Sequence, residues 1–381
     1  MKAYTKDELK AMYAARKNRL FAYMKEHGIT AVVFEDCEER RNPAVRYYSG
    51  HPNDALLVMS AAGKTVLVPW DDILAHERAI DCKIVPWNKY GRESVRAVRS
   101  TLASFGIKER KNVDMPPTTP YPLFLKYLDA LDGWDVRCRE HSVHDFVTQQ
   151  RAIKDDYEIA CTREAARVGD LIIDRIEVGI REGWIQTETD VALLIERECR
   201  VNGCERTGFD TLAAGPARSW AIHAFPGYTA AAWPAPGLSI LDFGVVYEGY
   251  TSDTTLTVAK YPLTDEQEKQ LALVEKAAQQ ALPLYKAGVP LRQAAQAAEL
   301  VFTKAKRTMP HTLGHGIGLE IHEYPRVSAK MAEDQTFQVG MIVTLEPGLY
   351  DAAIGGCRLE NDVLITKDGN EVLTHSRILR I

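Results

Sequence analysis

The chain has 381 residues, more than one ordinary hydrophobic core holds, so we expect two domains. Apolar residues make up 46% of the chain and charged residues 26%, a composition that excludes a disordered chain and suits a globular fold. The net charge of -5 comes without any run of Lys or Arg, which excludes nucleic acid and a membrane surface as expected partners and favours a small peptide or another small molecule.

Neither a membrane span nor a secretion signal is expected. No apolar run reaches the roughly 18 to 20 residues that cross a bilayer, and the segment MKAYTKDELK at the start lacks an apolar signal core. The seven cysteines are scattered without a CxxC pair, which is typical of reduced thiols rather than a disulfide framework. We therefore expect a cytoplasmic protein and assign no cysteine a role.

The first part of the chain alternates between strand and helix patterns. Thr5 and Glu8 form a capping box that predicts a helix ending at Gly28. Residues 29–36 read as a buried strand, and residues 55–70 read as two strands joined by a tight turn. Further elements are predicted as helices near 71–80, 91–105 and 121–131 and as short strands at 82–87 and 111–115. This alternation predicts an α/β domain over residues 1–148.

The rest of the chain places long helices among strands that look antiparallel. Amphipathic helices are predicted at 149–180, 187–201, 264–285 and 291–306. The closing strands are predicted around 341–346, 358–366 and 371–380. Helices laid on a mostly antiparallel sheet predict an α+β domain over residues 149–381.

A histidine-rich stretch, HTLGHGIGLEIHEYP from His311 to Pro325, is the centre of the second domain. Glycines alternate with other residues from Gly314 to Gly318, which disfavours a helix and so argues against a helical His/His zinc face. Glycines in this pattern favour close approach of the backbone to a neighbouring strand or ligand. A single histidine in such a stretch is more often structural than catalytic, so the neighbouring carboxylates decide how it is interpreted.

Two aspartates are predicted to share one face of a hairpin. The segment LSILDFGVVYEGYTSDTT contains Asp242 and Asp253 on either side of a turn at 247–249. In a hairpin with an even-numbered loop, cross-strand partners differ by odd numbers, and 253 minus 242 is 11. The two carboxylates should therefore lie close together, where they repel each other unless a cation lies between them.

Further carboxylates follow near the end of the chain. In GGCRLENDVLI, alternation points Arg358 and Glu360 to one face and Cys357 to the other, so Cys357 is an unsuitable ligand. Together the strands offer four carboxylates, Asp242, Asp253, Glu346 and Glu360. Their charge matches two divalent cations, and oxygen ligands with one imidazole favour Mn, Co, Fe or Zn over a thiolate zinc site.

These segments resemble the pita-bread metallopeptidase family, which includes Xaa-Pro aminopeptidases, Xaa-Pro dipeptidases (prolidases), methionine aminopeptidases and creatinase. HTLGHGIGLEIHEYP resembles the GHGIGLxxHExP signature of that family, LEPGLY its ExGxY segment and CRLEN its RxED segment. The first domain is similar to the creatinase-type N-terminal domain. The resemblance implies a creatinase-like N-terminal domain over 1–148, a pita-bread catalytic domain over 149–381, and a homodimer.

The resemblance also implies a role for each site residue. The implied ligands of two divalent metal ions, manganese being the first choice, are Asp242, Asp253, His315, Glu346 and Glu360. Asp253 and Glu360 would bridge the metals, and Glu346 would shuttle a proton. His223 and His322 would contact substrate and stabilise the tetrahedral intermediate, and Arg358 would hold a ligand carboxylate.

The implied function is hydrolysis of Xaa-Pro peptide bonds by a metal-bridging hydroxide, as a dipeptidase or an aminopeptidase. Three departures from the family pattern, Ile222 for proline, Leu256 for arginine and Asn361 for aspartate, keep other functions open, and we expect the first two to lie near the substrate entrance. One alternative is a non-peptidase relative, either a small-molecule C–N hydrolase or a lyase acting on a sulfonium acid such as dimethylsulfoniopropionate. Another is a binding module without catalysis, against which the intact set of clustered carboxylates argues.

Overall fold

The computed structural model describes residues 3–107 and 111–381, and the chain divides into two compact units. One unit, here the N-terminal unit, ends at Gln150, and the other, the C-terminal unit, runs from Arg151 to Ile381. No helix within the described ranges combines the length and apolar character needed to cross a bilayer. The cytoplasmic location and the homodimer stay predictions.

The N-terminal unit is a six-stranded mixed sheet in the order β4-β3-β2-β1-β5-β6. Its strands are β1 (Ala31–Asp36), β2 (Ala55–Ser60), β3 (Thr65–Pro69), β4 (Lys83–Ile84), β5 (Asn112–Met115) and β6 (Asp135–Cys138). Its helices are α1 (Lys6–Glu26), α2 (Pro43–Ser49), α3 (Asp72–Arg78), η1 (Trp87–Tyr90), α4 (Ser94–Ser104), α5 (Tyr121–Ala130) and most of α6 (Val143–Ala152). The capping box of Thr5 with Glu8 is present at the start of α1, and the predicted α/β class is confirmed.

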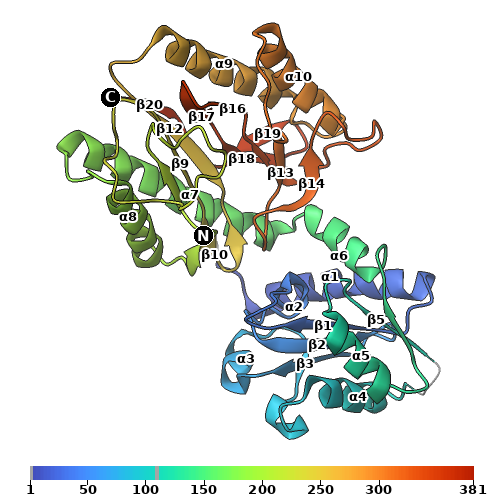
Figure 1. Ribbon diagram of the computed structural model, residues 1–381. Helices are drawn as coiled ribbons and strands as arrows, with labels where there is room; N and C mark the ends of the chain where they lie inside the picture. The colour runs from blue at the N-terminus through green and yellow to red at the C-terminus, as the bar shows by residue number, and fades with distance from the viewer. Residues whose placement is uncertain (1–2, 108–110) are drawn as a thin grey trace. The chain divides into compact units, whose positions relative to one another are not determined.

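In the C-terminal unit, strands lie between two pairs of helices (Figure 1). The helices are α7 (Asp156–Glu182), α8 (Glu188–Val201), α9 (Asp265–Ala281), η2 (Leu282–Leu284) and α10 (Leu291–Lys304). One main sheet has the order β20-β12-β9-β8, with β8 (Leu212–Ala214), β9 (Gly237–Phe243), β12 (Thr254–Lys260) and β20 (Ile378–Arg380). The other has the order β14-β13-β15-β18-β19, with β13 (Gly314–Gly316), β14 (Glu323–Val327), β15 (Ile342–Leu345), β18 (Asn361–Ile365) and β19 (Asn370–Val372). The remaining strands are β7 (Arg206–Thr207), β10 (Val245–Tyr247), β11 (Tyr250–Thr251), β16 (Gly348–Asp351) and β17 (Gly355–Arg358). Nearly all pairings are antiparallel, so the predicted α+β class is confirmed.

The single helix predicted over 149–180 is wrong at its start. The chain forms α6 and α7 with a break between them, because Asp155 caps α7 in a capping box with Glu158. Within the break, the Lys154 amide donates to the Gly340 carbonyl at 2.9 Å, a bond that a continuous helix could not make. The break therefore anchors the start of α7 to a distant part of the same unit.

Candidate metal centre

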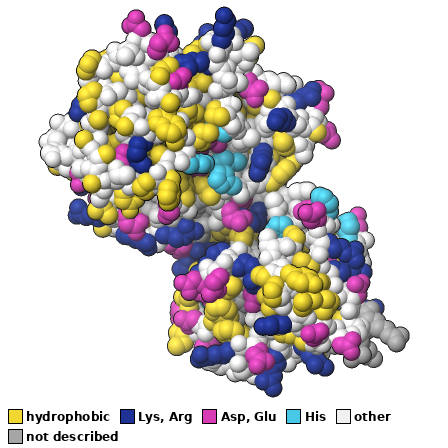
Figure 2. Space-filling view, viewed as in Figure 1, with side chains coloured by type: hydrophobic (Ala, Val, Ile, Leu, Met, Phe, Trp, Pro, Cys, Tyr) yellow, Lys and Arg dark blue, Asp and Glu magenta, His cyan; other side chains and the backbone are white. Residues whose placement is uncertain are grey.

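A cavity of about 850 Å³ in the C-terminal unit is lined by the predicted site residues. They are His223, Asp242, Asp253, His315, His322, Glu346, Arg358 and Glu360. Figure 2 shows histidine side chains gathered on one face of this unit. The structure therefore brings together residues from the β9–β12 hairpin, the histidine-rich stretch and the closing strands.

The β9–β12 ladder places the two aspartates on the same face. Asp242 lies opposite Thr255, two residues from Asp253, so the two carboxylates are diagonal neighbours. The turn consists of Glu248 and Gly249, which both have positive φ angles, one residue tighter than predicted. Asp242 Oδ1 and Asp253 Oδ1 are buried without a hydrogen-bond partner among the described residues. Buried oxygens of this kind are free to bind a cation.

His315 lies in β13 between two glycines that no larger residue could replace. A Cβ at Gly314 would collide with the Thr344 carbonyl, and one at Gly316 would collide with the Tyr324 carbonyl. The Nδ1–H of His315 donates to the Gly316 carbonyl at 3.1 Å, which leaves the lone pair on Nε2. Nε2 lies 3.5 Å from Glu346 Oε1 and 3.7 Å from Asp253 Oδ2. Burial lowers the pKa of His315 to about 4, so the ring is a neutral ligand at pH 7.

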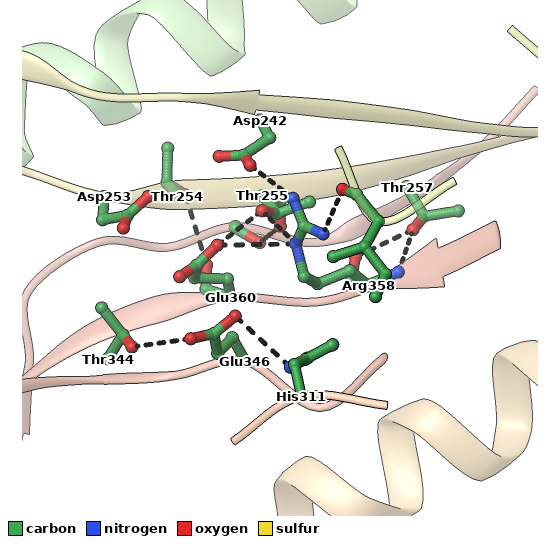
Figure 3. A network of polar contacts seen from close by, with 12 residues as sticks. Asp242, Asp253, Thr254, Thr255, Thr257, His311, Thr344, Glu346, Arg358 and Glu360 are labelled. Atoms are coloured by element: carbon green, nitrogen blue, oxygen red, sulfur yellow. Dashed lines mark hydrogen bonds and ion pairs between the residues drawn. The ribbon is translucent and has the colours of Figure 1, made fainter. Parts of the chain in front are cut away.

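Two glutamates complete the cluster, Glu346 directly after β15 and Glu360 directly before β18 (Figure 3). Glu360 Oε2 accepts from Thr255 Oγ1 at 2.5 Å, and Glu346 Oε1 accepts from Thr344 Oγ1 at 3.4 Å. Asp253, His315 and Glu360 each offer an atom that lies within 4.8 Å of the atoms offered by the other two. Three ligand atoms this close together could hold one metal ion.

Burial and like charge shift the pKa values of these carboxylates. Burial, followed by the charges of neighbouring carboxylates, raises the pKa of Asp253 and Glu360 well above the ordinary range. Burial also raises the pKa of Glu346 to about 7, helped by Asp242 and opposed by Arg358. Clustered carboxylates with free oxygens and a neutral imidazole fit divalent cations, since positive charge would remove the repulsion.

Arg358 is hydrogen-bonded on every side of its guanidinium. Nη2 donates to Asp242 Oδ2, and Nε donates to Thr255 Oγ1 at 2.9 Å. Nη1 donates to the Ile222 carbonyl at 3.2 Å and to the Tyr350 hydroxyl at 2.9 Å. Arg358 therefore holds Asp242 in place, the contact that its predicted role requires.

Several cavity residues were not singled out from the sequence. His311 accepts from the Tyr350 hydroxyl at 3.0 Å, and its Nδ1 lies 3.7 Å from Glu346. Arg326 lies in β14 directly opposite His315. His311 is the first residue of the histidine-rich stretch, so the sequence did indicate that it could lie near the site. The strand register that pairs Arg326 with His315 cannot be inferred from spacing in the sequence.

The structure corrects one expectation about the departures from the family pattern. Leu256 is fully buried in the core with α7 and α8, so its expected place near the substrate entrance is wrong. Ile222 does line the cavity. Asn361 Oδ1 accepts from the Ser376 amide at 2.7 Å, a bond that an asparagine serves as well as an aspartate. Cys357 is buried beside Thr257 and does not line the cavity.

Known proteins match this chain over most of its length. The model of metallopeptidase family M24 matches residues 160–367. The protein YkvY of Bacillus subtilis (strain 168) is 36% identical over 235 residues, 61% of this chain but only 63% of that protein. An Xaa-Pro dipeptidase of Pyrococcus horikoshii is 29% identical over 93% of this chain and 95% of its own. The crystal structure of an X-Pro aminopeptidase from Thermotoga maritima MSB8 matches with a TM-score of 0.81 and 25% identity, over 95% of this chain and 99% of that one. These matches confirm the resemblance and the two-domain pita-bread fold, and the chain belongs to metallopeptidase family M24.

Proposed function

We propose that the protein hydrolyses Xaa-Pro dipeptides with two divalent cations, manganese first among them. Their ligands would be Asp242, Asp253, His315, Glu346 and Glu360. The observation that carries this proposal is the cluster of Asp253, His315 and Glu360, whose ligand atoms lie within 4.8 Å of one another in a cavity of about 850 Å³. When bound, two such cations lower the pKa of a bridging water to supply hydroxide near neutral pH and polarise the scissile carbonyl.

The side chains of the cavity fit the remaining steps. Glu346, which lines the cavity beside His315, would take a proton from water and pass it to the leaving proline nitrogen. His223 and His322 both line the cavity, and an imidazole has at least one N–H that could donate to the developing oxyanion. Arg358 would keep the Asp242 carboxylate oriented throughout.

Arg326 supports a dipeptide as the substrate. It lines the cavity opposite His315, and its guanidinium makes no hydrogen bond or ion pair with another residue in the described ranges. An arginine with free donors binds a carboxylate well. A dipeptide offers that carboxylate directly on the proline, whereas a longer peptide has an amide there. Proline itself has no N–H to satisfy, which suits a cavity wall that includes Tyr324 and Met331.

The proposed function is tested by hydrolysis of Ala-Pro, Ala-Pro-Ala and Ala-Ala. The protein is stripped of metal, Mn, Co or Zn is restored, and bound metal is counted in parallel. Cleavage of Ala-Pro alone, with two metals per chain, is the expected result. Cleavage of Ala-Pro-Ala would instead identify an aminopeptidase. Two bound metals without cleavage of an Xaa-Pro bond would point to a small-molecule hydrolase or lyase, and absence of bound metal would refute the metal centre.

Replacement of Arg326 by glutamine is expected to raise KM for Ala-Pro about 10- to 100-fold, because a charge-assisted hydrogen bond contributes about 1.5 to 3 kcal/mol. Hydrolysis of Ala-Pro-amide, which lacks the carboxylate, should change little. Arg292→Gln is the matched control, since Arg292 pairs only with the exposed Glu333 among the interactions of the described residues. Equal losses on Ala-Pro and Ala-Pro-amide would show that Arg326 does not bind the carboxylate.

A further inference from the structure

The segment from Gly215 to Thr229, here the His223 loop, forms one wall of the cavity. It follows β8 in the connection to β9 and contributes Ile222, His223, Ala224, Phe225 and Gly227 to the lining. His223 is exposed, and its imidazole makes no hydrogen bond or ion pair with any other residue that the structure describes. The position of this ring therefore depends on how the backbone of the loop is held.

A single buried carboxylate ties the two ends of the His223 loop together. Glu188, the first residue of α8, is 1% exposed. It accepts from the Gly215 amide at 2.7 Å, from the Thr229 amide at 2.7 Å and from Thr229 Oγ1 at 2.6 Å. Hydrogen bonds to an ionised acceptor are about twice as strong as neutral ones. Glu188 therefore closes the loop where it begins and where it ends.

Arg218 extends this closure to the part of the loop beside His223. Its Nη2 donates to Glu188 Oε2 at 2.8 Å and to the Ala213 carbonyl at 3.1 Å. Its Nη1 donates to the Pro226 carbonyl at 2.6 Å. One guanidinium thus joins Glu188, the end of β8 and the chain that follows Phe225, and a rigid planar donor of this kind allows little movement between them.

The chain before His223 has anchors of its own. Ser219 Oγ donates to the Leu238 carbonyl at 2.7 Å and accepts from the Gly356 amide at 3.0 Å. The Ile222 carbonyl accepts from Arg358, which also holds Asp242. The backbone before His223 is therefore held by Ser219 and Arg358, and the backbone after it is held by the Arg218–Glu188 pair.

We propose that Arg218 and Glu188 are positioning residues that fix His223 in the cavity for catalysis. Neither side chain lines the cavity, so they act on substrate only through the loop. The kinetic test of this proposal depends on the proposed function, the hydrolysis of Xaa-Pro dipeptides. The structural test depends only on the His223 loop. It predicts that breaking the pair moves His223 while the metal ligands stay where they are.

The structural test is limited digestion of Arg218→Ala with chymotrypsin. Trp220 and Tyr228 are 47% and 40% exposed on the loop, so cleavage after them reports on loop opening. We expect cleavage about tenfold faster than in the unmodified protein, since local opening exposes the backbone to the protease, with metal content unchanged. The matched control is Arg377→Ala, which loses bonds to Asp174 and Glu177 at 2.8 and 2.7 Å outside the cavity.

The kinetic test is a double-mutant cycle on Ala-Pro hydrolysis. Arg218→Ala should lower kcat about 10- to 100-fold, since a misplaced catalytic group costs about that much, and added guanidinium should restore part of the loss. In a His223→Ala background the same change should cost less than about threefold, because the group that it positions is absent. A merely structural role would lower kcat equally in both backgrounds.

Two results would overturn the proposal. One is digestion of Arg218→Ala at the rate of Arg377→Ala, and the other is an additive double-mutant cycle. If Arg218→Ala does not fold, Thr229→Val takes its place in both tests, since it removes the hydroxyl bond to Glu188 together with the bond that the same hydroxyl accepts from the Ala231 amide. Absence of Xaa-Pro hydrolysis in the unmodified protein would refute the proposed function, and digestion would still decide whether the pair holds the loop.

Discussion

Asparagine in place of Asp253 is expected to lower kcat/KM for Ala-Pro about 1000-fold, because a metal centre supplies several kcal/mol of transition-state stabilisation. Asp253 is buried in the cluster with His315 and Glu360 and has an oxygen without a partner among the described residues. Asparagine keeps the shape of the side chain but removes its charge. The fold should survive, because burial and the repulsion from Glu360 already raise the pKa of Asp253.

Three measurements check this prediction together, namely kcat/KM, metal per chain, and the melting temperature in EDTA. We expect loss of activity and of metal with a melting temperature that is unchanged or higher, since one repelling charge is gone. Asp174→Asn is the matched control, the same exchange on the exposed part of α7 where Asp174 pairs with Arg377. Full activity of Asp253→Asn with two bound metals would refute the two-metal mechanism.

Local patterns predicted much of the fold and of the metal-ligand face. The capping box at Thr5 depends on residues three apart, so the start of α1 could be read directly. Strand alternation placed Asp242 and Asp253 on one face, and it separated Arg358 from Cys357. In each case the regular repeat of the local backbone determines the direction of the side chain, without any contact to a distant segment.

Contacts between distant segments could not be predicted in the same way. The break before α7 begins at the local capping box of Asp155, but the bond that the Lys154 amide donates to Gly340, far along the chain, has no counterpart in local spacing. Leu256 was misplaced because the family pattern alone suggested its position, whereas alternation from Asp253 points it to the opposite face of the strand, where it packs with α7 and α8. The pairing of Arg218 with Glu188 joins an irregular loop to a helix start, and neither has a period from which the other could be inferred.

The metal-free protein is expected to lose stability as the pH rises from about 5 to about 7. Burial raises the pKa of Glu346 from the ordinary 4.5 to about 7, so the folded state holds a proton that the unfolded state has released in this interval. Stability falls with pH wherever the folded state binds more protons. Glu346 alone accounts for about 3 kcal/mol of unfolding free energy, at 1.36 kcal/mol for each pKa unit. Asp253 and Glu360 shift in the same direction.

Bound cations should reverse this trend, because they replace the protons and bind the deprotonated ligands more tightly as the pH rises. We therefore expect the difference in melting temperature between the Mn-loaded and the EDTA-treated protein to widen between about pH 5 and about pH 8. Glu346→Gln, the matched control, should weaken the pH dependence in EDTA. Parallel curves for the loaded and metal-free protein would contradict the prediction.

A carboxylate held by an ion pair, such as Glu323 with a pKa of about 2 beside Arg151 and Lys154, loses its stabilising effect toward low pH instead. The sign of the slope in EDTA thus separates a cation site from a structural salt bridge.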